Sequence, residues 1–151
     1  MKLTNGFDIS SSALTAQRFR MDIISSNIAN ADTTRGKLVD GRWVPYQRKL
    51  VAMEAKEPAP FSRLLEQSMG GMAAAGEGVR VSRVFEDEAP FKQVYNPTHP
   101  DADERGYVEM PNVDILKEMV DMMSATRSYE ANVTAPNATK AMITKALEIG
   151  K

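Results

Sequence analysis

Apolar side chains near the start of the chain recur every seven residues. The row consists of Phe7, Leu14, Met21 and Ile28, with Ile24 and Ala31 at interleaved positions. This spacing places the side chains along one side of an α-helix and predicts a helix over residues 8–30. We expect Asp8 to cap its N-terminus and Asn30 to close it in the left-handed conformation.

A second, longer apolar row begins after Pro111. Its spacing alternates between four and three residues, which is typical of a coiled coil. We call this row the seam; it consists of Ile115, Met119, Met122, Thr126, Tyr129, Val133, Pro136, Lys140, Ile143 and Leu147. We expect Asn112 to cap this helix and Asp114 to lie in its first turn, where the helix dipole favours a negative charge.

Pro136 interrupts the second helical pattern. A proline inside a helix removes one backbone hydrogen bond and costs roughly 3 kcal/mol or more. Because the seam continues in register after the proline, we predict a kink at about Asn132–Pro136 within one helix. A true break that gives two shorter helices is the open alternative.

The pattern between the two helical segments indicates strands. Residues 37–52 predict a β-hairpin, because Asp40 and Gly41 form a strong turn signal between apolar pairs. A second strand region spans residues 78–95, and residues 86–90 could turn between its two halves. Residues 54–77 are rich in Ala, Gly, Pro and Met and predict a flexible insertion, with a short helix over residues 61–69.

The predicted fold is mainly α with a small β region. Residues 1–34 and 111–151 would form a domain in which the N- and C-terminal helices pair as a coiled-coil hairpin. Residues 35–110 would form a middle domain with a short β-hairpin. At 1.5 Å per residue the helices would be ~33 Å and ~55 Å long, so the second overhangs the first.

An overhanging apolar stripe predicts contacts with other chains, because uncovered apolar surface usually marks an interface. Isolated helices are marginal in water, so we expect the terminal helices to be weakly ordered in the monomer and firm in an assembly. The alternative is that the middle strands fold back over the overhang and complete a self-contained monomer.

Composition narrows the classes of partner. The 151 residues include 19 basic and 20 acidic side chains, for a formal net charge of −1. This balance gives no broad attraction to nucleic acid or to anionic membranes. No apolar run approaches the roughly 18 residues of a membrane span, and the first residues lack the apolar block of a signal peptide. We therefore expect no nucleic-acid binding, no membrane insertion and no cleaved signal.

Few residues could form a catalytic or metal-binding site. The chain has no cysteine and a single histidine, His99, which excludes a typical zinc site and does not indicate a nucleophile–base pair. Asp101 and Asp103 with Gly106 resemble the start of a calcium loop, but Arg105 stands where an oxygen ligand is needed, so we favour a structural turn. We expect no catalytic, cofactor or metal site.

Several segments resemble a known family. Residues 26–34, Ser-Asn-Ile-Ala-Asn-Ala-Asp-Thr-Thr, resemble the Asn-x-Ala-Asn-x-x-Thr motif of flagellar rod, hook and related axial proteins. Residues 96–108, Asn-Pro-Thr-His-Pro-Asp-Ala-Asp-Glu-Arg-Gly-Tyr-Val, and residues 111–114, Pro-Asn-Val-Asp, resemble the proximal-rod members of that family. Residues 118–122 and 128–132 do so as well.

The resemblance implies a structural rod subunit, required for motility, that is exported by the flagellar type III apparatus without signal cleavage. It implies assembly into a helical rod that crosses the periplasm, with the terminal helices in an inner coiled-coil layer around the export channel. The implied neighbours are other copies of the chain, FlgB, FlgF, FliE and, further along the rod, FlgG. The alternative is a small coiled-coil adaptor or regulatory protein that binds one soluble partner.

We predict that the apolar rows and a few polar residues make the contacts between subunits. Asn27, Asn30 and Thr33 would satisfy backbone groups at the bend after the first helix, and Tyr129 and Asn132 would offer matching polar contacts. The predicted interface set is Leu14, Met21, Ile24, Asn27, Ile28, Asn30, Thr33, Ile115, Met119, Met122, Tyr129, Asn132, Val133, Ile143 and Leu147.

Overall fold

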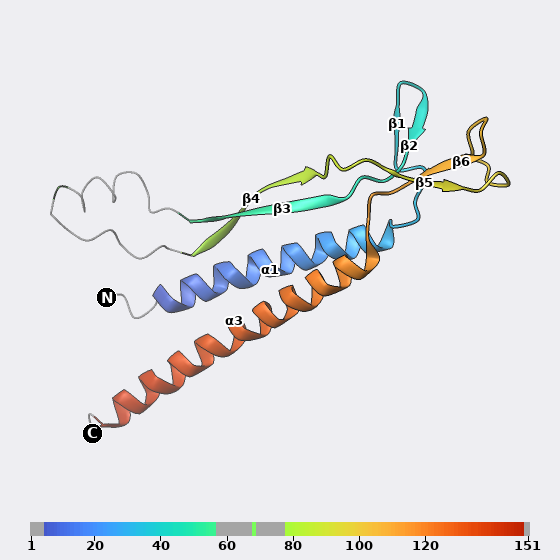
Figure 1. The fold of residues 1–151 in the computed structure, drawn as a ribbon. Helices are drawn as coiled ribbons and strands as arrows, with labels where there is room; N and C mark the ends of the chain where they lie inside the picture. The colour runs from blue at the N-terminus through green and yellow to red at the C-terminus, as the bar shows by residue number, and fades with distance from the viewer. Residues whose placement is uncertain (1–4, 57–67, 69–77, 150–151) are drawn as a thin grey trace. The chain divides into compact units, whose positions relative to one another are not determined.

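The computed structural model describes residues 5–56, 68 and 78–149 (Figure 1). Along these residues the elements are α1 (Asn5–Ala29), β1 (Lys37–Val39), β2 (Arg42–Val44), β3 (Lys49–Ala55), β4 (Val79–Glu86), β5 (Lys92–Tyr95), β6 (Tyr107–Met110) and α3 (Ile115–Ile149). The prediction of a mainly α chain with a small β region is confirmed. None of the helices in the described ranges is long and apolar enough to span a membrane.

α1 matches the first predicted helix, but both of its predicted ends are wrong. The helix begins at Asn5, so Asp8 lies within its first turn and does not cap it. Asn30 is not left-handed, because Asp40 is the only described non-glycine residue with a positive φ. The Asn30 side-chain amide instead donates a hydrogen bond to the Ser26 carbonyl at 2.9 Å, and the same carbonyl accepts from the Asn30 backbone N–H at 3.1 Å.

α3 is one helix that continues through Pro136. The alternative of two shorter helices is therefore wrong, and the kink at this proline stays a prediction. The absence of a break agrees with the apolar periodicity, which keeps its register on both sides of the proline.

Asp114, and not Asn112, caps α3. The Asp114 Oδ1 atom accepts a hydrogen bond from the Leu116 backbone N–H at 3.1 Å, which satisfies one of the free donors of the first turn. Asn112 is engaged elsewhere, because its Oδ1 accepts from the Arg48 N–H at 2.8 Å and its Nδ2 donates to the Asp87 carbonyl at 3.1 Å.

The predicted hairpin turn is confirmed. β1 and β2 are antiparallel, Leu38 pairs with Trp43, and Asp40 and Gly41 have φ values of 49° and 80°. Two consecutive positive φ angles fit the type I′ turn that Asp-Gly favours. The hairpin ends at Val44, earlier than predicted, because the chain beyond it pairs with a different strand.

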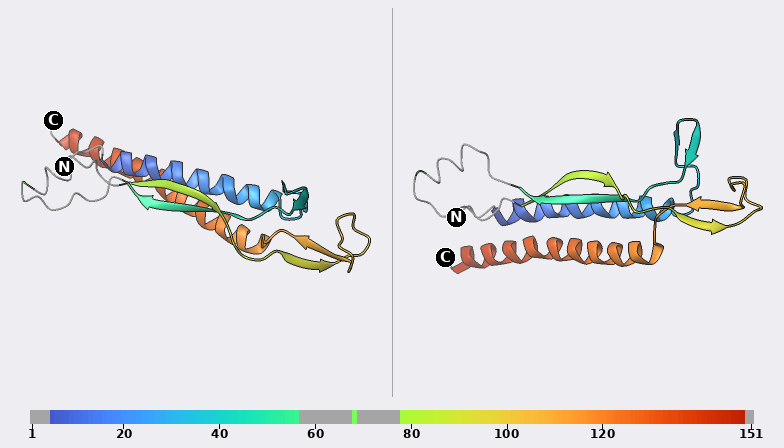
Figure 2. Two further views of the ribbon diagram at one scale, coloured as in Figure 1. Left: turned by 90° about the horizontal axis from the view of Figure 1, so that it is seen from above. Right: turned by 45° about the horizontal axis from the view of Figure 1, so that its top comes forward.

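The strands pair two by two as β1–β2, β3–β4 and β5–β6 (Figure 2). The predicted turn over residues 86–90 is therefore wrong, since this segment connects strands of two different pairs. β6 was not predicted, and it pairs antiparallel with β5 so that Tyr95 lies opposite Tyr107. β3 extends to Ala55, into the insertion predicted over residues 54–77. The rest of that insertion lies outside the described residues except Lys56 and Ser68, and so does nearly all of the predicted helix over 61–69.

The described chain groups into two compact units, and both helices contribute to each. The first unit contains α1 through Phe19, β3 from Ala52, β4 through Arg83 and α3 from Ala125. The second contains the remainder of these elements together with the β1–β2 and β5–β6 pairs. The predicted division into a terminal-helix domain and a middle domain stays a prediction.

The second unit holds the polar and apolar contacts that position the candidate interface. Its buried apolar side chains include Ile24, Val108 and Val113, and its buried polar side chains include Asn27 and Glu118. Within this unit α1 and α3 run antiparallel, because Arg20 contacts Asp121 while Asn27 contacts Glu118. The hairpin pairing of the two helices is thus confirmed for this part, and a coiled-coil geometry stays a prediction.

Candidate assembly interface

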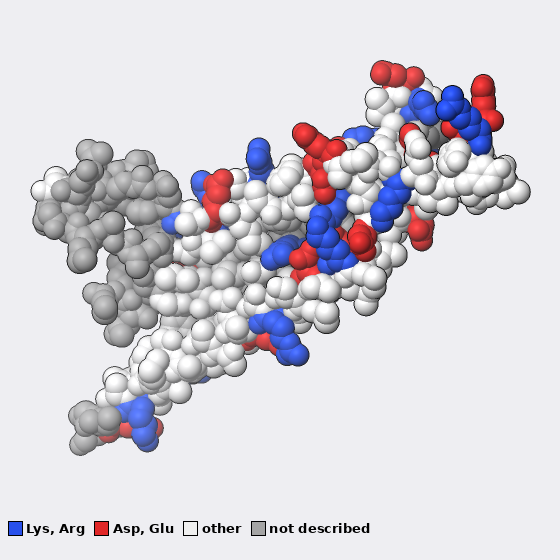
Figure 3. All heavy atoms as spheres, in the orientation of Figure 1, with Lys and Arg blue, Asp and Glu red and all other residues white. Residues whose placement is uncertain are grey.

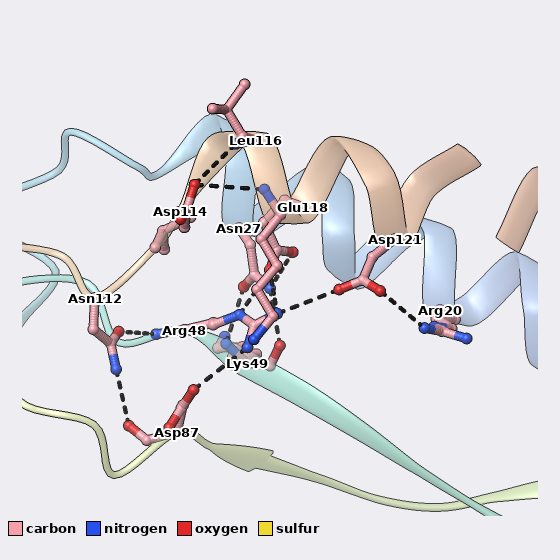
Figure 4. A network of polar contacts seen from close by, with 12 residues as sticks. Arg20, Asn27, Arg48, Lys49, Asp87, Asn112, Asp114, Leu116, Glu118 and Asp121 are labelled. Carbon is pink, nitrogen blue, oxygen red and sulfur yellow. Dashed lines mark hydrogen bonds and ion pairs between the residues drawn. The ribbon is translucent and has the colours of Figure 1, made fainter. Parts of the chain in front are cut away.

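A buried polar network joins α1, the start of β3 and α3 (Figure 4). We use this name for Asn27, Arg48, Asp87, Asn112, Glu118 and Asp121. Asn27 and Glu118 are each only 1% exposed. Buried polar groups are costly unless they are hydrogen-bonded, so the partners of these two side chains decide how the helices can pack.

Asn27 is fully used as a hydrogen-bonding group. Its Nδ2 donates to the Lys49 carbonyl at 2.9 Å and to Glu118 Oε2 at 3.0 Å. Its Oδ1 accepts from the Lys49 N–H and from the Tyr46 hydroxyl, each at 3.0 Å. The backbone groups that Asn27 satisfies belong to Lys49 of β3, so the prediction that this side chain satisfies backbone groups at the bend after α1 is wrong.

Glu118 and Arg48 form the ion pair at the centre of the network. Arg48 Nε donates to Glu118 Oε1 at 2.7 Å, and Arg48 Nη2 lies 2.5 Å from the same oxygen. Burial disfavours the charged guanidinium, but the hydrogen bonds and charges of Glu118 and then Asp87 outweigh it and raise the pKa of Arg48 above its ordinary value.

The outer contacts of the network are longer. Arg48 Nη2 lies 3.5 Å from Asp121 Oδ2, and Arg48 Nη1 lies 3.5 Å from Asp87 Oδ2. Asp121 also accepts from Arg20 of α1 at 3.4 Å. The two half-buried aspartates thus add negative charge around Arg48, and Arg20 pairs with one of them.

The bend after α1 is held by a second set of contacts. Thr33 Oγ1 donates to Asn30 Oδ1 at 3.3 Å, and the Tyr46 N–H donates to the Thr33 carbonyl at 3.0 Å. Asp101 accepts from Arg35 Nε at 2.7 Å and from Thr34 Oγ1 at 2.8 Å. The predicted role of Asn30 and Thr33 at the bend is thus supported by their contacts.

Asp101 stabilises this bend through its hydrogen bonds to Thr34 and Arg35. The hydrogen bond from Arg35 and then that from Thr34 lower the pKa of Asp101 below its ordinary value, and the same carboxylate raises the pKa of Arg35. Asp103 Oδ1 accepts from the Arg105 and Tyr107 backbone N–H groups at 2.9 and 2.8 Å. Both carboxylates accept hydrogen bonds from the protein itself, as expected of a structural turn.

The face that α3 buries differs from the seam. The buried row includes Glu118, at 1% exposed, while the neighbouring seam residues Ile115 and Met119 are exposed. Met122, the next residue of the seam, is half-buried. The helix thus turns a charged position inward where the sequence pattern predicted an apolar one.

The first ten residues of α3 carry large apolar side chains on their outer side. We call Ile115, Leu116, Met119, Val120 and Met123 the outer apolar face; they are between 43% and 76% exposed. At about 100° per residue these five positions occupy one continuous side of the helix. Further along α3, Val133, Met142 and Leu147 are exposed as well.

The predicted interface residues fall into three groups by burial. Ile24 and Asn27 are buried; Leu14, Met21, Ile28, Asn30, Thr33, Met122, Tyr129, Asn132 and Ile143 are half-buried; Ile115, Met119, Val133 and Leu147 are exposed. Asn132 donates to the Ser128 carbonyl of its own helix at 2.8 Å. The polar partners of Asn27 are Glu118, Tyr46 and Lys49, and not Tyr129 and Asn132 as expected.

Sequence reasoning missed Arg48 and Glu118. Charged residues are rarely buried, so nothing in the pattern marks these two as partners across 70 positions of sequence. The one signal is indirect: Glu118 falls inside residues 118–122, a segment that resembles the axial family.

Charges on the visible surface are mixed. On the face shown in Figure 3, basic side chains lie beside acidic ones, with uncharged surface between them. Exposed side chains of opposite sign also form pairs, such as Lys37–Glu86 at 2.7 Å and Arg127–Glu130 at 3.0 Å. Such a surface favours association through apolar faces over steering by a field of one sign.

Comparisons with known proteins agree with the resemblance. A family model described as "Flagella basal body rod protein" matches residues 7–36, and one described as "Flagellar basal body rod FlgEFG protein C-terminal" matches residues 104–149. The chain is 59% identical to the flagellar basal-body rod protein FlgC of Bacillus subtilis over 151 residues, which is all of both chains. It is 46% identical to that of Escherichia coli, also over all of both chains, and 39% identical to that of Aquifex aeolicus over all of this chain and 99% of the relative.

Proposed function

Because the chain belongs to the FlgC family of flagellar basal-body rod proteins, we propose that it is a structural subunit of the proximal rod that assembles through the outer apolar face of α3. The observation that carries the proposal is the exposure of five large apolar side chains on one side of a helix whose inner side is occupied by Glu118 and Asp121. The family is structural, so its members act by binding one another and not by catalysis.

Hydrophobic burial supplies the energy for this assembly. Each Å² of apolar surface removed from water contributes roughly 25 cal/mol, so a face with five large side chains can drive a stable contact between subunits. The exposed side chains of Val133, Met142 and Leu147 would extend the contact along α3. The half-buried members of the predicted interface set would complete it once a neighbouring helix covers them.

The role of a rod subunit also indicates which proteins the chain contacts. A rod subunit must contact other rod components, and we propose further copies of the chain, FlgB, FlgF, FliE and FlgG as these neighbours. The proposed location is the basal-body rod across the periplasm, reached by way of the flagellar type III export apparatus. The proposed inner coiled-coil layer would be formed by α1 and α3 of successive subunits.

Two charges placed on the outer apolar face test the proposal. The double variant Leu116→Glu/Val120→Glu should keep its fold, because both side chains are exposed and surface substitutions usually change stability by about 0.5 kcal/mol or less. In a motile host whose own FlgC relative is deleted, the double variant should fail to restore swimming and rod formation.

The matched control is Lys117→Glu, which adds an acid at an exposed position of the same helix turn but outside the outer apolar face. This control should swim as the unchanged chain does. Normal swimming by a folded Leu116→Glu/Val120→Glu variant would show that the outer apolar face is not the assembly surface.

A further inference from the structure

The observed packing of α3 differs by a small rotation from one that would bury the seam. On a helix with about 100° per residue, the seam residues Ile115, Met119 and Met122 are centred roughly 60° from Glu118. A roll of that size would bury apolar side chains against the chain's own α1 and β3 and turn Glu118 toward water. The hydrophobic effect alone favours this second packing, because it removes more apolar surface from solvent.

The buried polar network opposes the roll. In the observed packing Glu118 accepts hydrogen bonds from both Arg48 and Asn27, and Arg48 is itself buried. Rolling α3 away would leave a buried guanidinium and a buried amide without these partners. A buried charge without its partner is strongly destabilising, so the ion pair selects one helix orientation even though it adds little net stability.

We propose that Arg48 and Glu118 are positioning residues that hold the outer apolar face of α3 outward, where neighbouring subunits can cover it. In their absence the same helix buries its seam within its own chain and becomes unable to assemble. The role of this orientation in assembly rests on the proposed function. The orientation itself is a property of the free monomer and can be measured there.

The double variant Arg48→Met/Glu118→Gln removes both charges without placing an apolar side chain on the inner side of α3. In the rolled packing the buried seam replaces the buried ion pair, and such a replacement is often neutral or stabilising, so this variant should melt at the same temperature or higher. The matched control is Arg127→Met/Glu130→Gln, which makes the same two changes in an exposed ion pair of the same helix. If the network were needed only for stability, the buried double variant would melt lower than the control.

Cysteine labelling reports the orientation directly. The chain contains no cysteine, so Met119→Cys introduces a single thiol on the outer apolar face. In the dilute full-length chain, the thiol should react at the rate of an exposed cysteine in the unchanged and control backgrounds. In the Arg48→Met/Glu118→Gln background it should react at least about tenfold more slowly, because the position becomes protected from solvent.

Equal labelling rates in a folded double variant would overturn the inference. If that variant does not fold, Glu118→Gln provides the second test, since it keeps the side-chain shape and removes the charge. It should slow labelling at position 119 by a smaller factor, and an unchanged rate would contradict the proposal. Because labelling is measured on monomers, a chain whose outer apolar face plays no part in a rod would still show the difference.

Discussion

In the first ten residues of α3, the side that packs against the protein carries charged side chains, and the side that faces water carries large apolar ones. The inner side presents Glu118 and Asp121 to α1 and β3, while the outer side presents Leu116, Val120 and their neighbours to water. Globular chains normally bury large apolar side chains and expose charged ones. On the proposed function, polar contacts orient this part of α3 within the chain, and its exposed apolar side chains are covered by other chains.

The largest difference between the two sides should appear on truncation to alanine. Glu118→Ala leaves Arg48 buried without its main partner and should lower the free energy of unfolding by about 3–5 kcal/mol. Leu116→Ala, on the outer side, should change it by about 0.5 kcal/mol or less. Urea unfolding of the two variants at neutral pH measures both values; similar losses would refute the contrast between the inner and outer sides.

A second contrast concerns the two ends of α3. The first turns are tied to α1 and β3 by the polar network, whereas Met142 and Leu147 near the other end are exposed. Amide hydrogens of residues 137–149 should therefore exchange at least about tenfold faster than those of residues 118–124 in the free chain. Mass spectrometry of exchanged peptides measures this, and uniform protection along α3 would contradict the expectation that the terminal helix becomes firm only in an assembly.

The smallest effect should come from the bend after α1. Since Arg35 and Thr34 lower the pKa of Asp101 in the folded chain, its contribution to stability is present above the ordinary carboxyl pKa and is lost as pH falls through the lower folded value. Asp101→Asn should therefore melt below the unchanged chain at pH 6, and the two melting temperatures should converge near pH 2.

The control for this pH effect is Asp22→Asn, which changes an exposed carboxylate on α1. Its melting temperature should differ little from that of the unchanged chain at pH 6. A difference for Asp101→Asn that stays constant from pH 6 to pH 2 would rule out the ion pair as its cause.

Local features of the fold could be predicted from the sequence. The Asp40-Gly41 turn and the turn around Asp103 depend on residues a few positions apart, so their side chains and backbone preferences suffice to indicate them. The existence of both helices follows from apolar periodicity in the same way. The resemblance of residues 26–34 and 96–108 to axial proteins led to the right family.

Non-local pairings could not be predicted in this way. Asn112 and Asp114 are both good capping residues, and the choice between them is made by the backbone of Arg48, far away in the sequence. The orientation of α3 could not be predicted either. The seam and the row through Glu118 have the same spacing along the helix, and only the distant partner Arg48 determines which row is buried. The strand pairs β3–β4 and β5–β6 likewise depend on segments that the local pattern does not connect.

The central claim is that the outer apolar face of α3 is open in the free chain and covered in the rod. A single cysteine at Leu116 tests it most directly, with Lys117→Cys as the control on the same turn. Labelling at position 116 should be fast in the dilute chain and blocked in isolated basal bodies that contain it. Labelling that is equally fast in both states would contradict the claim.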